Sequence, residues 1–199
     1  MAKALVVLAH PNQRSLTAHF AERAAAALRD AGHDVDWLDL AAAGFEPRLS
    51  ADERAAYYRQ PPDPPAAFDE ARRLAQAEIL VLAFPVWWSL PPALLVGFFD
   101  RVFAPGVAFD HGRDFGPLVP RLGRLRQVVA IAAFGSPWFF DRIIMRRPLR
   151  RILRTGLIKA CAPRARFDWL AFASAENPPA ARVAAFEARI ARLLAHAGA

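Results

Sequence analysis

The stretch Ile79-Leu80-Val81-Leu82-Ala83-Phe84-Pro85-Val86-Trp87-Trp88-Ser89-Leu90-Pro91-Pro92-Ala93 decides how this chain can fold. Its first part, Ile79 to Phe84, is continuously apolar, which is typical of a strand buried on both faces of a sheet. Pro91 and Pro92 suit the first positions of a helix, because proline fixes φ and gives up only an N–H that would lack a partner there. The stretch therefore predicts a strand, a tight loop and a helix.

Trp87 and Trp88 lie side by side in that loop and allow two interpretations. The two indoles pack beneath a neighbouring element as part of the core, or they cover a flat ligand at the end of the strand. These residues alone do not separate the two interpretations. The rest of the sequence favours the second.

The same alternation of strand and helix runs through the whole chain. Strands are predicted at Lys3 to Ala9, Val35 to Leu40, Glu78 to Phe84, Arg126 to Phe134 and Arg166 to Phe172, and helices at Ser15 to Asp30, Ala51 to Tyr58, Ala66 to Ala77, Pro91 to Phe103 and Pro178 to Ala195. Apolar strands that alternate with helices indicate a parallel sheet covered on both faces. In 199 residues they predict one flavodoxin-like, doubly wound α/β domain over residues 1–199, with five strands in the order 2-1-3-4-5.

The composition of the chain indicates the cellular compartment in which this domain is expected. Hydrophobic residues make up 55% of the chain, yet no apolar run approaches the roughly 20 residues that a membrane span needs. Cys161 is the single cysteine and cannot form an internal disulfide, which agrees with a reducing compartment. The chain enters its first strand without a signal-peptide pattern, so we expect a cytoplasmic protein.

A net charge of +7 comes with one cluster of basic residues near position 150. The cluster alternates with apolar residues and predicts a basic amphipathic helix; its arginines are Arg142, Arg146, Arg147, Arg150, Arg151 and Arg154. We expect a solvated helix face rather than a dedicated phosphate or membrane patch. No nucleic-acid partner is expected.

Several common sites are missing from the sequence. It has no G-x-G-x-x-G after the first strand, no G-x-x-x-x-G-K-[ST] and no G-x-S-x-G, which argues against a Rossmann dinucleotide site, a P-loop and a hydrolase elbow. The five histidines are scattered without ligand spacing near a carboxylate, so no metal site is expected.

The predicted topology instead brings three loops together. In a doubly wound sheet, ligands bind beyond the carboxyl ends of the strands, where the strand order reverses. The loops are His10 to Thr17, Pro85 to Ser89 and Ala132 to Phe140. The first offers a helix N-terminus to phosphate, the second offers planar aromatic rings, and the third offers a glycine where backbone can approach a ligand. Phosphate at one end and a flat ring at the other describe a flavin nucleotide.

These residues resemble the flavodoxin-like NAD(P)H:quinone oxidoreductases, the DT-diaphorase family and its bacterial relatives. The strongest match runs from Phe84 to Ala93, then through Gly97-Phe98-Phe99-Asp100-Arg101-Val102-Phe103 and Gly106-Val107-Ala108-Phe109. A second match is Leu8-Ala9-His10-Pro11 with Ser15-Leu16-Thr17. The similarity covers most of the chain and is weakest from about Glu46 to Ala67 and beyond Arg142.

The resemblance implies which residues bind the ligands. The flavin-binding residues would be His10, Ser15, Leu16 and Thr17 at the phosphate end, Pro85, Val86, Trp87 and Trp88 along the isoalloxazine, and Ala133, Phe134 and Gly135 after the fourth strand. Phe109, His111 and Phe140 would contact the substrate, although His111 also fits a surface loop. The resemblance further implies a homodimer, FAD or FMN as cofactor and NAD(P)H as co-substrate.

Two departures from the family stand close to the implied flavin. Relatives commonly carry Thr-Thr-Gly-Gly where this chain has Ala132-Ala133-Phe134-Gly135, and a tyrosine where it has Phe140. The changes remove hydroxyl donors, and phenylalanine cannot stabilise a charged flavin edge. Hydride transfer itself needs no side-chain acid or base, so no catalytic side chain is assigned.

We expect a flavoprotein that passes hydride from NAD(P)H to a quinone or similar acceptor. The alternative is a flavin-binding ancillary or regulatory subunit of a membrane transport system, as some relatives are. Docking of Arg142 to Arg154 on an acidic membrane protein or on anionic lipid would support that alternative.

Overall fold

The computed structural model describes residues 1–59, 67–112 and 116–198. The sequence Pro61-Pro62-Asp63-Pro64-Pro65, which is typical of a turn, lies outside the described residues. One sheet of five parallel strands organises the chain: β1 (Lys3–Leu8), β2 (Asp34–Asp39), β3 (Ile79–Val86), β6 (Gln127–Phe134) and β7 (Arg166–Phe172). Its order is β2-β1-β3-β6-β7, which confirms the predicted doubly wound, flavodoxin-like arrangement.

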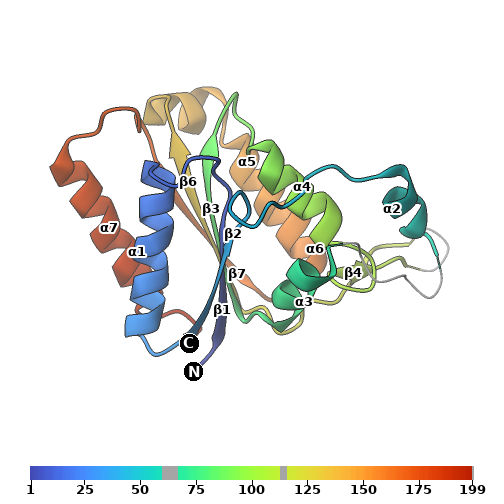
Figure 1. The fold of residues 1–199 in the computed structure, drawn as a ribbon. Coiled ribbons are helices and arrows are strands. Elements are labelled where there is room, and N and C mark those ends of the chain that lie inside the picture. Colours follow the sequence, from blue (N-terminus) through green and yellow to red (C-terminus); the bar gives the residue numbers. More distant parts are fainter. Residues whose placement is uncertain (60–66, 113–115, 199) are drawn as a thin grey trace.

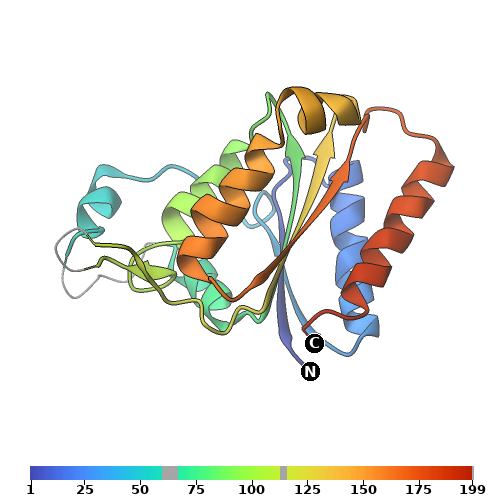
Figure 2. The same ribbon diagram turned by 180° about the vertical axis from the view of Figure 1, so that it is seen from behind.

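Helices cover both faces of the sheet (Figures 1 and 2). On one face lie α1 (Leu16–Asp30) and α7 (Ala180–Leu194); on the other lie α3 (Phe68–Gln76), α4 (Ala93–Val102) and a run made of α5 (Pro148–Arg151), the π-helix η3 (Ile152–Ile158) and α6 (Lys159–Cys161). A second π-helix, η2 (Phe140–Ile144), follows β6. The helix α2 (Ala51–Ala56) and the antiparallel pair β4 (Phe109–Asp110) and β5 (Val119–Pro120) lie beyond α4, away from the sheet.

The two central strands explain why the sheet is stable. All eight residues of β3 and all eight of β6 are buried, as their continuous apolar sequences require. Between α1, α7 and β7 the rings of Phe20, Phe172 and Phe186 meet with centroids 4.7–5.1 Å apart. The core is therefore divided by the sheet into two apolar layers, one on each face.

Several predicted boundaries were wrong by a few residues. The strand β3 continues past Phe84 to Val86, because Pro85 and Val86 still pair in register with β6. The helix α4 begins at Ala93, with Pro92 as its N-cap in an extended conformation, so neither proline occupies a helical position. The helices α3 and α7 each begin two residues later than predicted, at Phe68 and Ala180. The strands β4 and β5 were not predicted, since each has only two residues.

The prediction of one amphipathic helix over Arg142 to Arg154 was also wrong. The backbone leaves the helical region at Arg146 and Arg147, where φ is 55° and 53°. Pro148 then occupies the first turn of α5. The residue before a proline is sterically disfavoured in the right-handed helical region, so Pro148 accounts for the break. The arginine cluster is therefore distributed over η2, a left-handed turn and the run from α5 to η3.

Gly97 lets another segment of the chain pack closely against α4. A Cβ at position 97 would collide with the backbone of Pro47, so only glycine lets the 45–47 segment cross the helix. One turn later, Arg101 donates from Nε to Oε1 of Glu53 at 2.7 Å, and both side chains are largely buried. Its guanidinium also lies over the ring of Phe45 at 5.5 Å. The helix thus fastens the segment that follows β2 to the sheet.

The Gly97→Ala substitution is expected to lower the free energy of unfolding by about 1–3 kcal/mol, because the added methyl group overpacks a rigid backbone contact. Gly156→Ala is the matched control, since Gly156 is also helical but a Cβ there meets no atom within 4 Å. It should be neutral or stabilising by up to about 1 kcal/mol. Urea unfolding measures both, and equal effects would contradict the contact.

Candidate functional site

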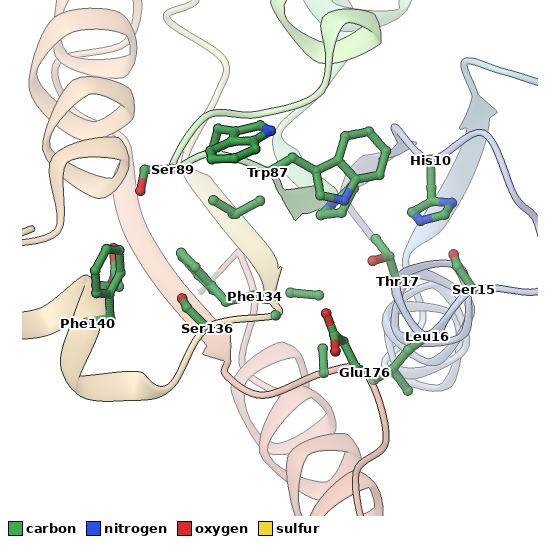
Figure 3. A pocket seen from close by; sticks show the side chains of 17 residues that line it. His10, Ser15, Leu16, Thr17, Trp87, Ser89, Phe134, Ser136, Phe140 and Glu176 are labelled. Carbon is green, nitrogen blue, oxygen red and sulfur yellow. The ribbon is translucent and has the colours of Figure 1, made fainter.

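The carboxyl ends of β1, β3 and β6 surround a cleft of about 760 Å³ (Figure 3). Its lining residues are His10, Ser15, Leu16, Thr17, Pro85, Val86, Trp87, Trp88, Ser89, Ala133, Phe134, Gly135, Ser136, Phe140, Asp141, Ala175 and Glu176. The structure therefore brings together all eleven residues that were predicted to bind the cofactor, and adds Phe140 from the predicted substrate set. In the close-up, Ser15 and Thr17 lie on the side opposite Phe140.

The N-terminus of α1 forms the first side of the cleft. Ser15 is the N-cap: its Oγ accepts the N–H of Ala18 at 3.1 Å, and its carbonyl accepts the N–H of His19 at 3.0 Å. The first N–H groups of a helix have no intrahelical acceptor, so those of Leu16 and Thr17 remain for a ligand. Together with the helix dipole they form a favourable site for phosphate.

His10 stands at the end of β1, next to this helix terminus. Its Nδ1 accepts the N–H of Asn12 at 2.9 Å, so in the neutral ring the proton is on Nε2. Burial lowers the pKa of the His10 imidazole from its usual value, although the negative charge of Asp39 opposes the shift. The ring also meets Trp87 edge to face, with centroids 5.8 Å apart. His10 is thus a neutral hydrogen-bond donor above its lowered pKa.

The aromatic loop after β3 is an open turn rather than part of the core. The N–H of Trp87 donates to the carbonyl of Leu90, and the N–H of Leu90 donates back to the carbonyl of Trp87. Between them, Trp88 and Ser89 adopt left-handed backbone angles, with φ of 54° and 61°. Trp87 is 47% exposed and Trp88 is 96% exposed. The interpretation of these indoles as buried core residues is therefore wrong, and they remain available to a ligand.

The loop after β6 closes the opposite side. The side chain of Phe134 is only 5% exposed and packs edge to face against Trp169, so the bulk that it adds goes largely into the core. At Gly135, a Cβ would lie 3.2 Å from Oε1 of Glu176. Glycine thus keeps the backbone close to Glu176 at the pocket wall.

Three lining residues lie outside the loops that the sequence analysis brought together: Asp141, Ala175 and Glu176. Ser89 and Ser136 lie within those loops but were assigned no role. Two of the three belong to the loop after β7, which is tied to the β6 loop by backbone bonds from Ser174 N–H to the Ser136 carbonyl and from Ala175 N–H to the Phe134 carbonyl. All parallel strands end at one edge of the sheet, so the loop after the fifth strand was a detectable candidate. Burial raises the pKa of the Asp141 carboxyl, while the charge of Arg147 opposes the shift.

Phe109 and His111, predicted to contact substrate, do not line this cleft. Phe109 is the first residue of β4 and His111 follows that strand; Nε2 of His111 is 2.9 Å from the carbonyl of Tyr57, and the His111 ring stacks on Tyr58. Phe109 meets His111 edge to face, with centroids 5.6 Å apart. His111 is half-buried rather than a free surface histidine. Its role at a substrate site stays a prediction.

Other candidate features carry little chemistry. Within residues 1–59, 67–112 and 116–198, no group of three or more His, Cys, Asp or Glu side chains is placed to hold a metal ion. The described helices include none that is long and apolar enough to cross a membrane. Cys161 is buried, and desolvation raises the pKa of its thiol to about 11, which agrees with a structural role.

Known proteins match this chain over most of its length. A sequence model of the family described as having a flavodoxin-like fold matches residues 2–197. The rat protein named NAD(P)H dehydrogenase (quinone) 1 is 26% identical over 206 residues, which span 93% of this chain and 74% of that protein. The chain belongs to the flavodoxin-like NAD(P)H:quinone oxidoreductase family. The predicted family and the expectation of an oxidoreductase are thereby confirmed.

Solved structures agree with the family's fold. The NAD(P)H:quinone oxidoreductase of Methanothermobacter marburgensis superposes with a TM-score of 0.84 at 21% identity, over 98% of both chains. The FMN-dependent NADH-azoreductase of Bacillus anthracis, solved in complex with FMN, superposes with a TM-score of 0.72 at 13% identity, over 96% of this chain and 97% of that one. At these identities the two structures show the fold alone.

The pKa of His10 is expected to lie below about 6.5, the ordinary value for histidine. Below pH 6.5 the His10 ring binds a proton more readily in the unfolded chain than in the folded chain. The contribution of His10 to the free energy of unfolding is therefore complete above pH 6.5 and falls as the pH drops below that value. An NMR titration of the ring measures the pKa. Urea unfolding at pH 7.5 and 5.5 should show a smaller loss in His10→Gln than in the wild type, whereas His196→Gln, at an exposed position, should keep the full loss. A His10 pKa at or above 6.5 would contradict the neutral donor.

Proposed function

We propose that the protein is a flavin-dependent NAD(P)H oxidoreductase that reduces a quinone or similar acceptor. One observation carries the proposal: the same cleft has helix amides at one side, unpaired among the described residues, and exposed indoles at the turn after β3. A flavin mononucleotide or the corresponding part of FAD has a phosphate and a flat ring in one molecule. The volume of about 760 Å³ lies within the usual range of about 300–1,000 Å³ for cofactor sites.

The residues present fit such a group. The N–H groups of Leu16 and Thr17 would hold the phosphate, with Ser15 keeping α1 capped behind them. Trp87 and Trp88 would lie against the ring system, with Val86 to Trp88 offering backbone groups to its polar edge. Gly135 has no Cβ, so the backbone of the β6 loop would approach the ring closely. The flavin would supply the acceptor and donor of hydride.

The side chains then bind and orient rather than exchange protons at the reacting atoms. His10 would donate from Nε2 while its Nδ1 stays occupied by Asn12. Phe140 contributes an apolar wall at the position where relatives carry a hydroxyl, so any proton for the reduced acceptor would come from water or from the acceptor's surroundings. A slower turnover, or an acceptor different from that of relatives, fits this wall.

FMN and FAD both fit this account. Two structures of similar fold, the azoreductase of Bacillus anthracis and a general stress protein of Treponema denticola, were solved in complex with FMN. They make FMN the first probe to use. FAD stays an equal candidate, because the adenosine part would contact the loops that differ most among relatives.

A homodimer fits the distribution of exposed apolar side chains. Large apolar residues gather in the loops after β3 and β6 and in the run that follows: Trp87, Trp88, Leu90, Trp138, Phe139, Phe140, Ile143, Ile144, Met145 and Ile152. Extended apolar patches of this kind mark interaction sites. A second copy over the cleft would cover them, and it would allow Phe109 and His111 to complete the substrate site of its partner. The acceptor itself is a small quinone-type molecule in this proposal.

Docking of the Arg142 to Arg154 cluster on a membrane partner or on anionic lipid stays a prediction, as does a cytoplasmic location. No observation on the structure favours the ancillary-subunit alternative over the oxidoreductase. The proposal is tested by titrating purified protein with FMN and with FAD and then following NAD(P)H oxidation with menadione. Yellow protein with turnover supports it. Failure to bind either flavin would end it.

Trp88→Ala is expected to weaken flavin binding by on the order of 1–3 kcal/mol, because it removes a ring that is exposed at the cleft. The unfolding free energy of the protein without flavin should change by less than about 0.5 kcal/mol, as for other surface positions. Trp138→Ala is the control, since Trp138 is 60% exposed but does not line the cleft. Equal flavin affinities in the two variants, measured by fluorescence titration, would show that Trp88 does not contact the ring.

Phe140→Tyr is expected to raise menadione turnover about tenfold, the effect of one added hydrogen bond worth about 1.4 kcal/mol in the transition state. Phe139→Tyr adds the same hydroxyl at a neighbouring exposed residue outside the cleft and should leave turnover unchanged. The measurement is kcat with flavin saturated. An unchanged kcat in Phe140→Tyr would show that the missing hydroxyl does not limit this protein.

A further inference from the structure

A second cavity of about 400 Å³ adjoins the cleft at the end of β6. Phe134 and Asp141 line both cavities, so the two are separated by one side chain from β6 and one from η2. The other lining residues come from the segment between β6 and η2, from η2 and the turn after it, from α5, from the edge strand β7 and the residue that follows it, and from α7: Pro137, Trp138, Arg142, Arg147, Arg150, Phe167, Asp168, Trp169, Ala171, Ala173 and Arg189.

The second cavity carries uncompensated positive charge. Four of its residues are arginines, and in the described parts of the chain the structure gives none of these four guanidinium groups a hydrogen bond or an ion pair. Arginines elsewhere do pair: Arg73 with Asp36 at 2.6 Å, and Arg121 with Asp110 at 2.7 Å. Four arginines that line one cavity repel one another, so the binding of an anion there is favoured.

The two carboxylates of the cavity do not neutralise this charge. Asp168 is already engaged, since Nε of Arg166 lies 3.0 Å from its Oδ2 and Nε2 of Gln127 donates to it at 2.7 Å. Asp141 interacts electrostatically with Arg147, and it lines the cleft as well as the second cavity. Even with both carboxylates ionised, four arginines leave a surplus of two positive charges.

The backbone holds two of the arginines in place. Arg147 lies in the left-handed turn, where its N–H donates to the carbonyl of Asp141 at 2.8 Å, and Pro148 starts α5 immediately after it. Arg147 and Arg150 are both half-buried at the cavity wall. Their neighbours Arg146 and Arg151 are exposed and do not line it. The arginine cluster is thus divided into a part that faces the cavity and a part that faces solvent.

Aromatic side chains form the remaining walls. The ring of Phe167 stacks on Trp169 with centroids 6.5 Å apart, and Trp138 is 60% exposed. Positive charge together with flat apolar walls suits a nucleotide better than a bare inorganic anion.

We propose that the second cavity binds the adenosine phosphate end of NADPH, with Arg147 and Arg150 holding its 2′-phosphate. The assignment rests on the proposed function, because it places the nicotinamide end of the same molecule in the adjoining cleft, past Phe134 and Asp141. A phosphate monoester offers the paired oxygens that guanidinium groups bind best. NADH lacks this group, so the site makes the protein selective for NADPH.

The test compares two double variants of equal charge change. Arg147→Gln/Arg150→Gln removes the cavity pair, and Arg146→Gln/Arg151→Gln removes the solvent-facing pair; each includes one left-handed position. Calorimetric titration with adenosine 2′,5′-bisphosphate should show at least a roughly tenfold loss of affinity in the cavity variant and less than about a twofold change in the control. The ratio of the KM values for NADPH and NADH should rise roughly tenfold in the cavity variant alone.

Three results would overturn the proposal. Equal losses in both variants would show a diffuse charge effect, which high salt would also remove. Equal affinity for adenosine 2′,5′-bisphosphate and for adenosine 5′-monophosphate would remove the 2′-phosphate from the site, and equal affinity for inorganic phosphate would reduce the cavity to a simple anion site. The titration needs no turnover and is therefore separate from failure of the oxidoreductase itself, which would appear as protein that binds no flavin. Circular dichroism confirms that both variants are folded.

Discussion

Parallel pairing of β1, β3 and β6 is the constraint on which the rest of the structure depends. Leu8 pairs with Ala83, and Val86 pairs with Phe134, so the loops that follow these strands leave the sheet together. Each loop alone is unremarkable in chemistry: a capped helix, an exposed turn with two indoles, and a glycine. Their complementarity arises because the sheet brings them to one edge, at the point where the strand order reverses.

The β6 loop serves both cavities. Phe134 buries its ring against Trp169, while its carbonyl accepts the N–H of Ala175. This arrangement fixes the wall between the cleft and the arginine-lined cavity. Phe134, which stands where relatives have a glycine, forms part of that wall. Phe134 therefore has two structural roles. Its ring packs against Trp169 in the core, and the same residue lines both the cleft and the arginine-lined cavity.

Much of the fold and of the candidate site could be predicted from the sequence, and the failures have physical causes. Continuous apolar runs such as Ile79 to Phe84 specified the buried strands, and the cleft then followed from topology, with its predicted cofactor-binding residues on its walls. The break in the helix at Arg147 was missed because the prediction followed the helical spacing of the apolar residues. It did not take into account that Pro148 disfavours the helical conformation of the residue before it. Glu176 was missed because no motif marks it, although its loop follows the fifth strand at the same edge of the sheet; backbone bonds to the β6 loop hold it at the cleft.

The central claim is that one cleft holds a flavin between the α1 terminus and the aromatic turn. Amide NMR spectra of the protein during an FMN titration test it most directly, since they report each side of the cleft separately. The account predicts saturable shifts at Leu16 and Thr17 together with Trp87, Trp88 and Gly135, at one common dissociation constant. Shifts confined to the arginine-lined cavity, or none that saturate at the α1 terminus, would contradict it.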